Sequence, residues 1–121
     1  MDIKEFARQA ALAEKMPYLG RHCTVIMNSY VKKVQNRGVG LADLAAALSV
    51  SVVKNALFSV IQLESAEELG DHIVAEGGTF YNDAVLRAFE RLTGKEVIRP
   101  DIAGLMGAYG MALKAKDQFG E

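Results

Sequence analysis

One stretch of the chain, residues 72–98, constrains the fold more than any other. It contains two short apolar runs on either side of a run with helical spacing, and a pair of glycines, Gly77 and Gly78, stands where the first run ends. This order of apolar and helical runs predicts a strand, a helix and a second strand parallel to the first, joined by a right-handed crossover. The expected elements are strand His72–Ala75, a helix near Thr79–Leu92, a turn at Thr93-Gly94 and strand Glu96–Ile98.

The remaining segments predict mainly helices, because apolar residues recur at three- and four-residue spacing. Helices are expected over Asp2–Lys15, from the caps Asn28 and Ser29 to Asn36, over Leu41–Leu63, in a short turn within 64–71, and from the cap Asp101 to Lys116. The β-branched run Cys23–Met27 predicts a further buried strand. The expected fold class is therefore α/β, helix-rich, with a small sheet of about three strands in a single domain, residues 1–121.

The segment Leu41–Leu63 is apolar on more than one side. A helix of this kind is covered on several sides. In a chain of 121 residues it is either the central helix or a helix packed against another chain.

Composition excludes several classes of function. The formal charge of −1 gives no long-range attraction for nucleic acid or for an anionic membrane. No apolar run is expected to approach the roughly 20 residues of a membrane span, and the charged, amphipathic N-terminus does not suggest a signal peptide. A single cysteine cannot form an internal disulfide and fits a reducing compartment. The expected location is cytoplasmic.

The glycine pair Gly77-Gly78 is the first candidate site. It lies where a parallel strand ends and a helix begins, which is the usual ligand position in α/β sheets. Glycine lets a phosphate or a flat ring approach the main chain without a Cβ in the way. A tight structural turn is the alternative, since the pattern lacks the spacing of a GxGxxG or GxxxxGK[ST] loop.

Three more glycines, Gly104, Gly107 and Gly110, recur at three-residue spacing in the last predicted helix. Each costs about 1 kcal/mol relative to alanine in a helix. The favoured interpretation is close packing of this helix against the strand–helix–strand unit, and the alternative is a closely approaching ligand.

No catalytic constellation stands out. Asp43, Asp71, Asp83 and Asp101 fall at helix starts or turns, where capping explains them. Cys23 alone cannot build a zinc or iron–sulfur site, and a lone cysteine in an apolar run is usually a core residue. A symmetric dimer could bring two such cysteines together.

The runs "CTVIMNSYV", "SVSVVKNALFSVI" and "EGGTFYNDAVLRAFERLTGKEVIRPDIAGLMGAYGMALKAK" resemble the activator ATPases of 2-hydroxyacyl-CoA dehydratases, a family that includes the ATPase subunits of benzoyl-CoA reductase. The likeness covers about residues 2–116. It implies the actin, heat-shock protein 70 and sugar-kinase type of ATPase fold, with nucleotide held between two halves, of which this chain resembles only the second.

The resemblance also implies roles for single residues. Gly77 and Gly78 match the family's adenosine-side glycines, and Thr79 and Asn82 follow in the same motif. Lys54 stands where the family has a basic helix residue that could flank the adenine. Cys23 matches the second of two cysteines that each subunit gives to a [4Fe-4S] cluster bridging a homodimer. ATP or ADP with Mg²⁺ and the cluster are thus the implied cofactors, and a dehydratase or reductase is the implied partner.

The chain departs from the family at the catalytic elements. The D-x-G-x-[ST] phosphate loop and the Cys-x-x-Gly-[ST]-Gly segment are absent, and one cysteine per chain gives a dimer two thiolates where four are needed. The resemblance thus suggests a truncated piece or a remnant of an activator, which alone is expected neither to hydrolyse ATP nor to hold the cluster.

Two hypotheses follow. The first is the C-terminal, nucleotide-binding part of an ATP-dependent iron–sulfur activator. The second is a non-catalytic interaction or dimerisation module whose ligand sites have decayed or been cut away.

Overall fold

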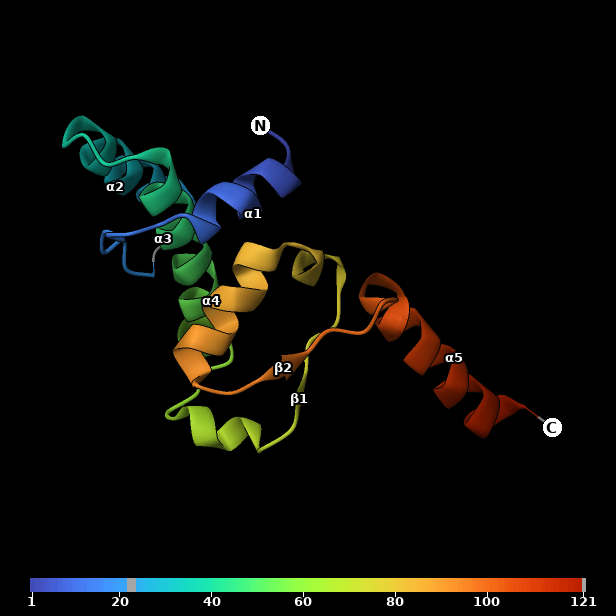
Figure 1. Ribbon diagram of the computed structural model, residues 1–121. Helices are drawn as coiled ribbons and strands as arrows, with labels where there is room; N and C mark the ends of the chain where they lie inside the picture. The colour runs from blue at the N-terminus through green and yellow to red at the C-terminus, as the bar shows by residue number, and fades with distance from the viewer. Residues whose placement is uncertain (22–23, 121) are drawn as a thin grey trace.

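The computed structural model describes residues 1–21 and 24–120. Most helices lie to one side of a small parallel sheet, and the last helix projects from the body (Figure 1). The α-helices are α1 Ile3–Ala11, α2 Thr24–Asn36, α3 Leu41–Lys54, α4 Asp83–Thr93 and α5 Met106–Phe119. The strands are β1 Ile73–Val74 and β2 Val97–Ile98, and a π-helix, Asn55–Val60, and three 3₁₀ turns, Ala66–Leu69, Gly78–Tyr81 and Ala103–Leu105, complete the order.

The predicted strand–helix–strand unit is confirmed. β1 and β2 pair in parallel, with Ile73 opposite Val97. The helix between them is divided, because the 3₁₀ turn Gly78–Tyr81 precedes α4. Asn82 caps α4 by accepting a hydrogen bond from the Ala84 amide, and Gly94 ends it at φ 66°. Both ends of α4 therefore have their expected capping residues.

The expected third strand, Cys23–Met27, is wrong: within the described part of the chain the sheet has two strands, and Thr24 begins α2. Cys23 itself lies outside the described residues. Asn28 and Ser29 consequently lie inside a helix rather than at its cap. Helical spacing explains the outcome, since one face of α2 packs on a core cluster through Met27, Val31 and Val34. This packing outweighs the β propensity of a short run.

The long apolar segment forms the central helix, as expected. α3 continues into the π-helix, and both α1 and α4 pack against α3. Two buried serines sit on α3: the Ser49 hydroxyl donates to the Ala45 carbonyl, and the Ser51 hydroxyl donates to the Gly20 carbonyl at 2.6 Å. The second bond ties α3 to the segment that precedes α2.

The same helix corrects one expectation. Leu41–Val60 has 20 residues and a mean hydropathy of 1.5 in its most apolar window, so by length and composition alone it could cross a membrane. In the structure 39% of that window is buried inside the molecule. Helices α1 and α4 cover part of this helix, and some of its apolar side chains, such as Val52, remain exposed.

Helix α4 lies between α3 and the sheet and joins two core clusters. Val85 and Ala88 pack with Val53 and Leu57 on the α3 side. On the other side, Leu86 and Phe89 pack against the buried face of the strands, which consists of Ile73, Ala75 and Val97. The glycine pair therefore stands at the end of a strand whose position α4 fixes.

The last helix differs from its prediction. Asp101 lies in a turn rather than at a cap, and α5 follows the 3₁₀ turn Ala103–Leu105. Close packing is confirmed for Gly104 alone, where a Cβ would meet the Tyr81 ring at 2.8 Å. It is wrong for Gly107 and Gly110, since among the described residues nothing lies within 4 Å of a Cβ placed there. Within the described part of the chain no residue of α5 is buried, and the main contact of this helix is with the turn Ala103–Leu105 that precedes it.

The two serines of α3 provide a matched test of this architecture. Ser51→Ala should lower the free energy of unfolding by about 1–3 kcal/mol, because it leaves the Gly20 carbonyl without its buried donor. Ser49→Ala should cost much less, since the Ala45 carbonyl still accepts the helical bond of residue 49. Urea denaturation of both variants measures the difference, and equal losses would contradict the role of the Ser51–Gly20 bond.

Candidate functional site

The glycine loop, residues 76–82, leaves the carboxyl end of β1 and leads into α4. Ala75 continues the sheet by donating its amide to the Ile98 carbonyl at 2.8 Å. Gly77 then adopts φ 104°, and its amide donates to the Ala103 carbonyl at 2.6 Å. A side chain at Gly77 would be strained at this φ. The turn interpretation therefore explains Gly77.

Gly78 is different. Its φ lies outside the left-handed region, and in the described part of the chain no atom lies within 4 Å of a Cβ placed on it. Neither backbone conformation nor packing within the chain requires glycine at this position. The residue is exposed and begins the 3₁₀ turn that precedes α4. A flat or charged group could thus approach its main chain directly.

The two other predicted residues of the loop have different surroundings. Thr79 is exposed, and no hydrogen bond of its side chain is found within the described ranges. Asn82 is 8% exposed, and its side-chain oxygen is already engaged in capping α4. The structure therefore leaves Thr79 accessible to a ligand and gives Asn82 a capping role.

Lys54 lies apart from the loop. Its Nζ stands 5.3 Å from the centroid of the Tyr18 ring, and it lines a cavity of about 130 Å³ together with Gly20 and Ser51. No residue of the glycine loop lines that cavity. The structure thus places Lys54 at a cavity that the glycine loop does not line, and Cys23 lies outside the described residues.

A facing loop, residues 99–105, holds the glycine loop in place. The Tyr81 hydroxyl donates to the Asp101 carbonyl at 3.2 Å and accepts from the Gly104 amide at 2.9 Å. The Arg99 guanidinium donates to the Phe80 carbonyl at 2.8 Å and to Asp83 at 2.6 Å. Together with the Gly77–Ala103 bond, these contacts join the segments that follow β1 and β2.

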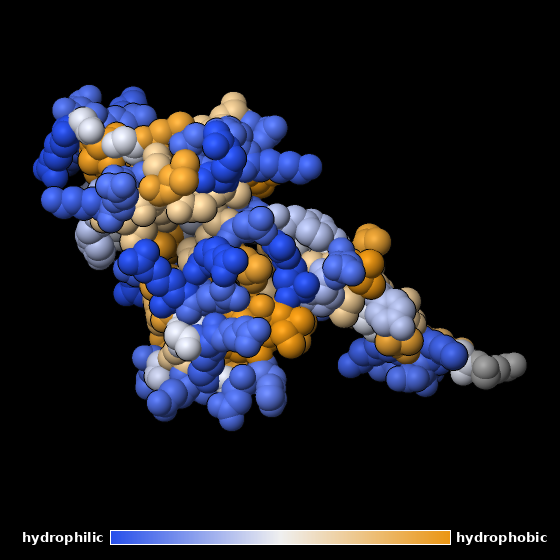
Figure 2. Space-filling model, viewed as in Figure 1, coloured by the Kyte–Doolittle hydropathy of each residue, from blue (hydrophilic) through white to orange (hydrophobic). Residues whose placement is uncertain are grey.

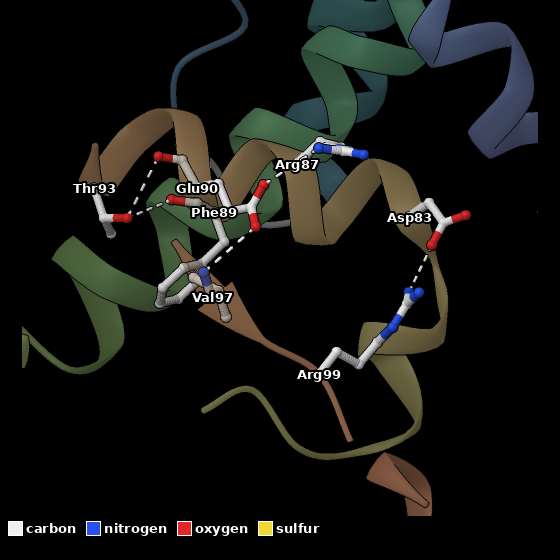
Figure 3. A network of polar contacts seen from close by, with 7 residues as sticks. All are labelled: Asp83, Arg87, Phe89, Glu90, Thr93, Val97 and Arg99. Carbon is white, nitrogen blue, oxygen red and sulfur yellow. Dashed lines mark hydrogen bonds and ion pairs between the residues drawn. The ribbon is translucent and has the colours of Figure 1, made fainter. Parts of the chain in front are cut away.

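Figure 3 shows how the same region is tied to α4. Asp83 at the start of the helix points to Arg99, and Glu90 further along accepts a hydrogen bond from the Val97 amide at 3.4 Å. Sequence reasoning missed Tyr81 and Arg99, because each acts on a residue 16 or more positions away. A local sequence pattern does not predict pairs of residues this far apart in the chain.

A larger cleft of about 980 Å³ runs between α1, α3 and α4. Tyr81, Asp83 and Asp101 line it beside the glycine loop, whereas Gly77 and Gly78 do not. Its basic residues are Lys4, Arg8, Arg87, Arg91 and Arg99. Several of them are already paired with carboxylates, and Arg8, for example, binds Glu5 and with Gln9 lowers the pKa of that carboxyl to about 2. Arg8, Arg87 and Arg99 are thus paired, whereas Lys4 and Arg91 form no ion pair among the described residues.

The loop contact can be tested through Tyr81. Tyr81→Phe removes one donor and one acceptor and should lower the free energy of unfolding by about 0.5–1.5 kcal/mol. It should also speed hydrogen exchange of the Gly77 and Gly104 amides. Tyr109→Phe, at a similarly exposed tyrosine of α5, is the matched control and should change neither. Unchanged amide exchange in Tyr81→Phe would contradict the role of its hydroxyl.

Comparison with known proteins finds similarity to activators of dehydratases, and no family model matches the chain. The chain is 29% identical over 121 residues to the 2-hydroxyisocaproyl-CoA dehydratase activator of Clostridioides difficile, and it covers 44% of that protein. The solved structure of the activator of the 2-hydroxyisocaproyl-CoA dehydratase from Clostridium difficile, with bound ADPNP, matches 98% of this chain at 28% identity and a TM-score of 0.75. This chain covers 42% of that structure.

The solved structure of component A of the (R)-2-hydroxyglutaryl-CoA dehydratase from Acidaminococcus fermentans also matches 98% of this chain, at 28% identity and a TM-score of 0.79. The chain again covers 44% of that protein, so it spans less than half the length of these relatives. The resemblance inferred from the sequence is confirmed, as is the actin-like ATPase fold class that it implied.

Proposed function

We propose that this chain acts as a nucleotide-binding part of an ATP-dependent activator of a 2-hydroxyacyl-CoA dehydratase or a related reductase. Its similarity to a dehydratase activator extends over the whole chain, and the solved structure of such an activator contains bound ADPNP. The glycine loop would contact the adenosine side of ATP or ADP. The dehydratase or reductase would be the partner of the complete activator.

Gly78 carries the proposal. Nothing in the described structure requires glycine at this position, yet the residue stands at the carboxyl end of a parallel strand, where ligands bind in α/β folds. A nucleotide lying against the main chain would account for the missing side chain. Thr79 is the neighbouring group that remains accessible to the nucleotide.

The chemistry of ATP hydrolysis belongs to a larger assembly. This chain lacks a phosphate loop of D-x-G-x-[ST] type. We therefore assign it nucleotide binding rather than catalysis and propose that the chain alone is inactive as an ATPase. Mg²⁺ would enter with the nucleotide phosphates, as is usual for this ion. In a complete activator, hydrolysis would drive a conformational change that sends one electron to the dehydratase.

The [4Fe-4S] cluster does not fit this chain. Such a cluster needs four thiolates, and one cysteine per chain gives a homodimer only two. Among the described residues, no group of three or more histidine, cysteine or acidic side chains is placed to hold a metal ion. No step of the proposed function therefore passes through a cluster bound by Cys23 alone.

A non-catalytic interaction module is the second candidate. It is favoured by helix α5, which has no buried residue and exposes large apolar side chains. The two candidates differ at the glycine loop, which binds nucleotide in the first and has lost its ligand in the second.

Calorimetric titration with ADP and Mg²⁺ tests the nucleotide site. The chain should bind ADP, and Gly78→Val should weaken the affinity at least tenfold, about 1.4 kcal/mol, because the valine side chain occupies the space above the main chain. Gly40→Val is the matched control, since Gly40 has an ordinary φ of −69° and equally open surroundings.

The control should bind ADP as the unchanged chain does. Equal weakening by both valines would show an effect on folding rather than on a site. If the unchanged chain shows no binding at millimolar ADP, the glycine loop does not form a nucleotide site in this chain.

A further inference from the structure

We propose that Arg99 is a positioning residue for the nucleotide site. Its guanidinium holds the Phe80 carbonyl and the Asp83 carboxylate, and through them it fixes the main chain of Gly78 in the conformation that a nucleotide meets. The inference rests on the proposed function and adds to it a residue that acts on nucleotide binding through the glycine loop.

The glycine loop has few hydrogen bonds of its own around Gly78. The turn Gly78–Tyr81 has four residues, and two backbone hydrogen bonds of 3.1 Å close its start and its end. Hydrogen bonds of 3₁₀ type have poorer geometry than those of an α-helix. Gly78 has no side chain to pack, and Thr79 is exposed. The position of this main chain therefore depends on contacts with other segments.

The backbone of Arg99 is held by the sheet. Arg99 follows β2 directly, and β2 pairs with β1, the strand that leads into the glycine loop. Pro100 comes next, which favours an extended backbone at Arg99. From this position the Arg99 side chain reaches back to the glycine loop, so the pairing of the strands determines where its guanidinium can bind.

Two contacts with the facing loop lie on either side of Gly78. Before it, the Gly77 amide donates to the Ala103 carbonyl; after it, Arg99 Nη1 donates to the Phe80 carbonyl at 2.8 Å. No other donor to the Phe80 carbonyl is found among the described residues. Loss of the Arg99 side chain would therefore release the main chain on one side of Gly78 while the other side stays held.

Asp83 orients the guanidinium. The same Nη1 donates to Asp83 at 2.6 Å, and Figure 3 shows the Arg99 side chain reaching from the segment after β2 to this carboxylate at the start of α4. The Arg99 and Asp83 side chains are 29% and 67% exposed, and Figure 2 shows hydrophilic residues over much of the surface around α4. An ion pair in such surroundings contributes little to global stability. The contact therefore serves the local conformation of the loop more than the stability of the fold.

Arg87 allows the effect of position to be separated from the effect of charge. It lines the same cleft as Arg99 and also pairs with one carboxylate, that of Glu90 at 3.6 Å. In the described part of the chain no hydrogen bond or ion pair joins Arg87 to the glycine loop. If Arg99 acted by its positive charge alone, removal of either charge would weaken nucleotide binding to the same extent.

The test is calorimetric titration with ADP and Mg²⁺ at a temperature where every variant is folded. Arg99→Met should weaken ADP binding about tenfold, because the loop is no longer held in its binding conformation before the nucleotide arrives. Arg99→Lys should bind ADP more tightly than Arg99→Met, since an ammonium group can still donate to the Phe80 carbonyl.

Two controls accompany these variants. Arg87→Met removes the same charge from the same cleft, and Ser51→Ala lowers stability at a bond to Gly20, away from the glycine loop. Both should bind ADP as the unchanged chain does.

Hydrogen exchange without nucleotide gives an independent readout. The amides of Phe80 and Asn82, which close the turn, should exchange about fivefold faster in Arg99→Met, whereas the amides of α3 should not change.

The outcomes separate the two proposals. No binding of ADP by the unchanged chain would overturn the proposed function and the role of Arg99 with it. Binding that Arg99→Met leaves unchanged would overturn the role of Arg99 alone. Equal weakening by Arg87→Met or Ser51→Ala, an Arg99→Lys variant that binds no more tightly than Arg99→Met, or unchanged exchange at Phe80 and Asn82 would do the same.

Discussion

The packing of α4 between α3 and the strands is the interaction on which the rest of the structure depends. Two strands of two residues each cannot form a stable sheet alone. Here Leu86 and Phe89 cover one face of the strands, while Val85 and Ala88 anchor the same helix to α3. The edge-on contact between Phe80 and Phe89, with ring centroids 5.9 Å apart, extends this packing to the glycine loop. The position of the candidate site thus follows from one amphipathic helix.

The elements that sequence predicted well are those with strong local patterns. The run 72–98 carries two apolar strands, a helical pattern and a terminal glycine, and all of them appear in the structure, whereas the capping role of Asn82 was not predicted. The segment Cys23–Met27 failed because β propensity is a weak signal in a five-residue run. Contacts between residues far apart in the chain, such as the hydrogen bond from the Tyr81 hydroxyl to the Asp101 carbonyl, cannot be predicted from a single sequence. The same holds for the contact of the Lys54 Nζ with the Tyr18 ring.

The two adjacent glycines have separate causes. Gly77 is explained by its positive φ and by the bond to Ala103, so it would be needed even in a protein without a ligand. Gly78 has no such cause within the chain. A sequence shows only that two glycines are adjacent, and the structure separates the conformational requirement from the requirement for open space. The functional argument therefore depends on Gly78 and not on the pair.

The facing loop connects the glycine loop with helix α5. Its Ala103 carbonyl accepts a hydrogen bond from the Gly77 amide, and α5 begins directly after the loop at Met106. Because no residue of α5 is buried in the described structure and its main contact is with the turn Ala103–Leu105, a displacement of α5 would reach the body of the molecule chiefly through the facing loop. A movement of α5 would therefore act on the loop whose Ala103 carbonyl is hydrogen-bonded to Gly77, beside the candidate nucleotide site.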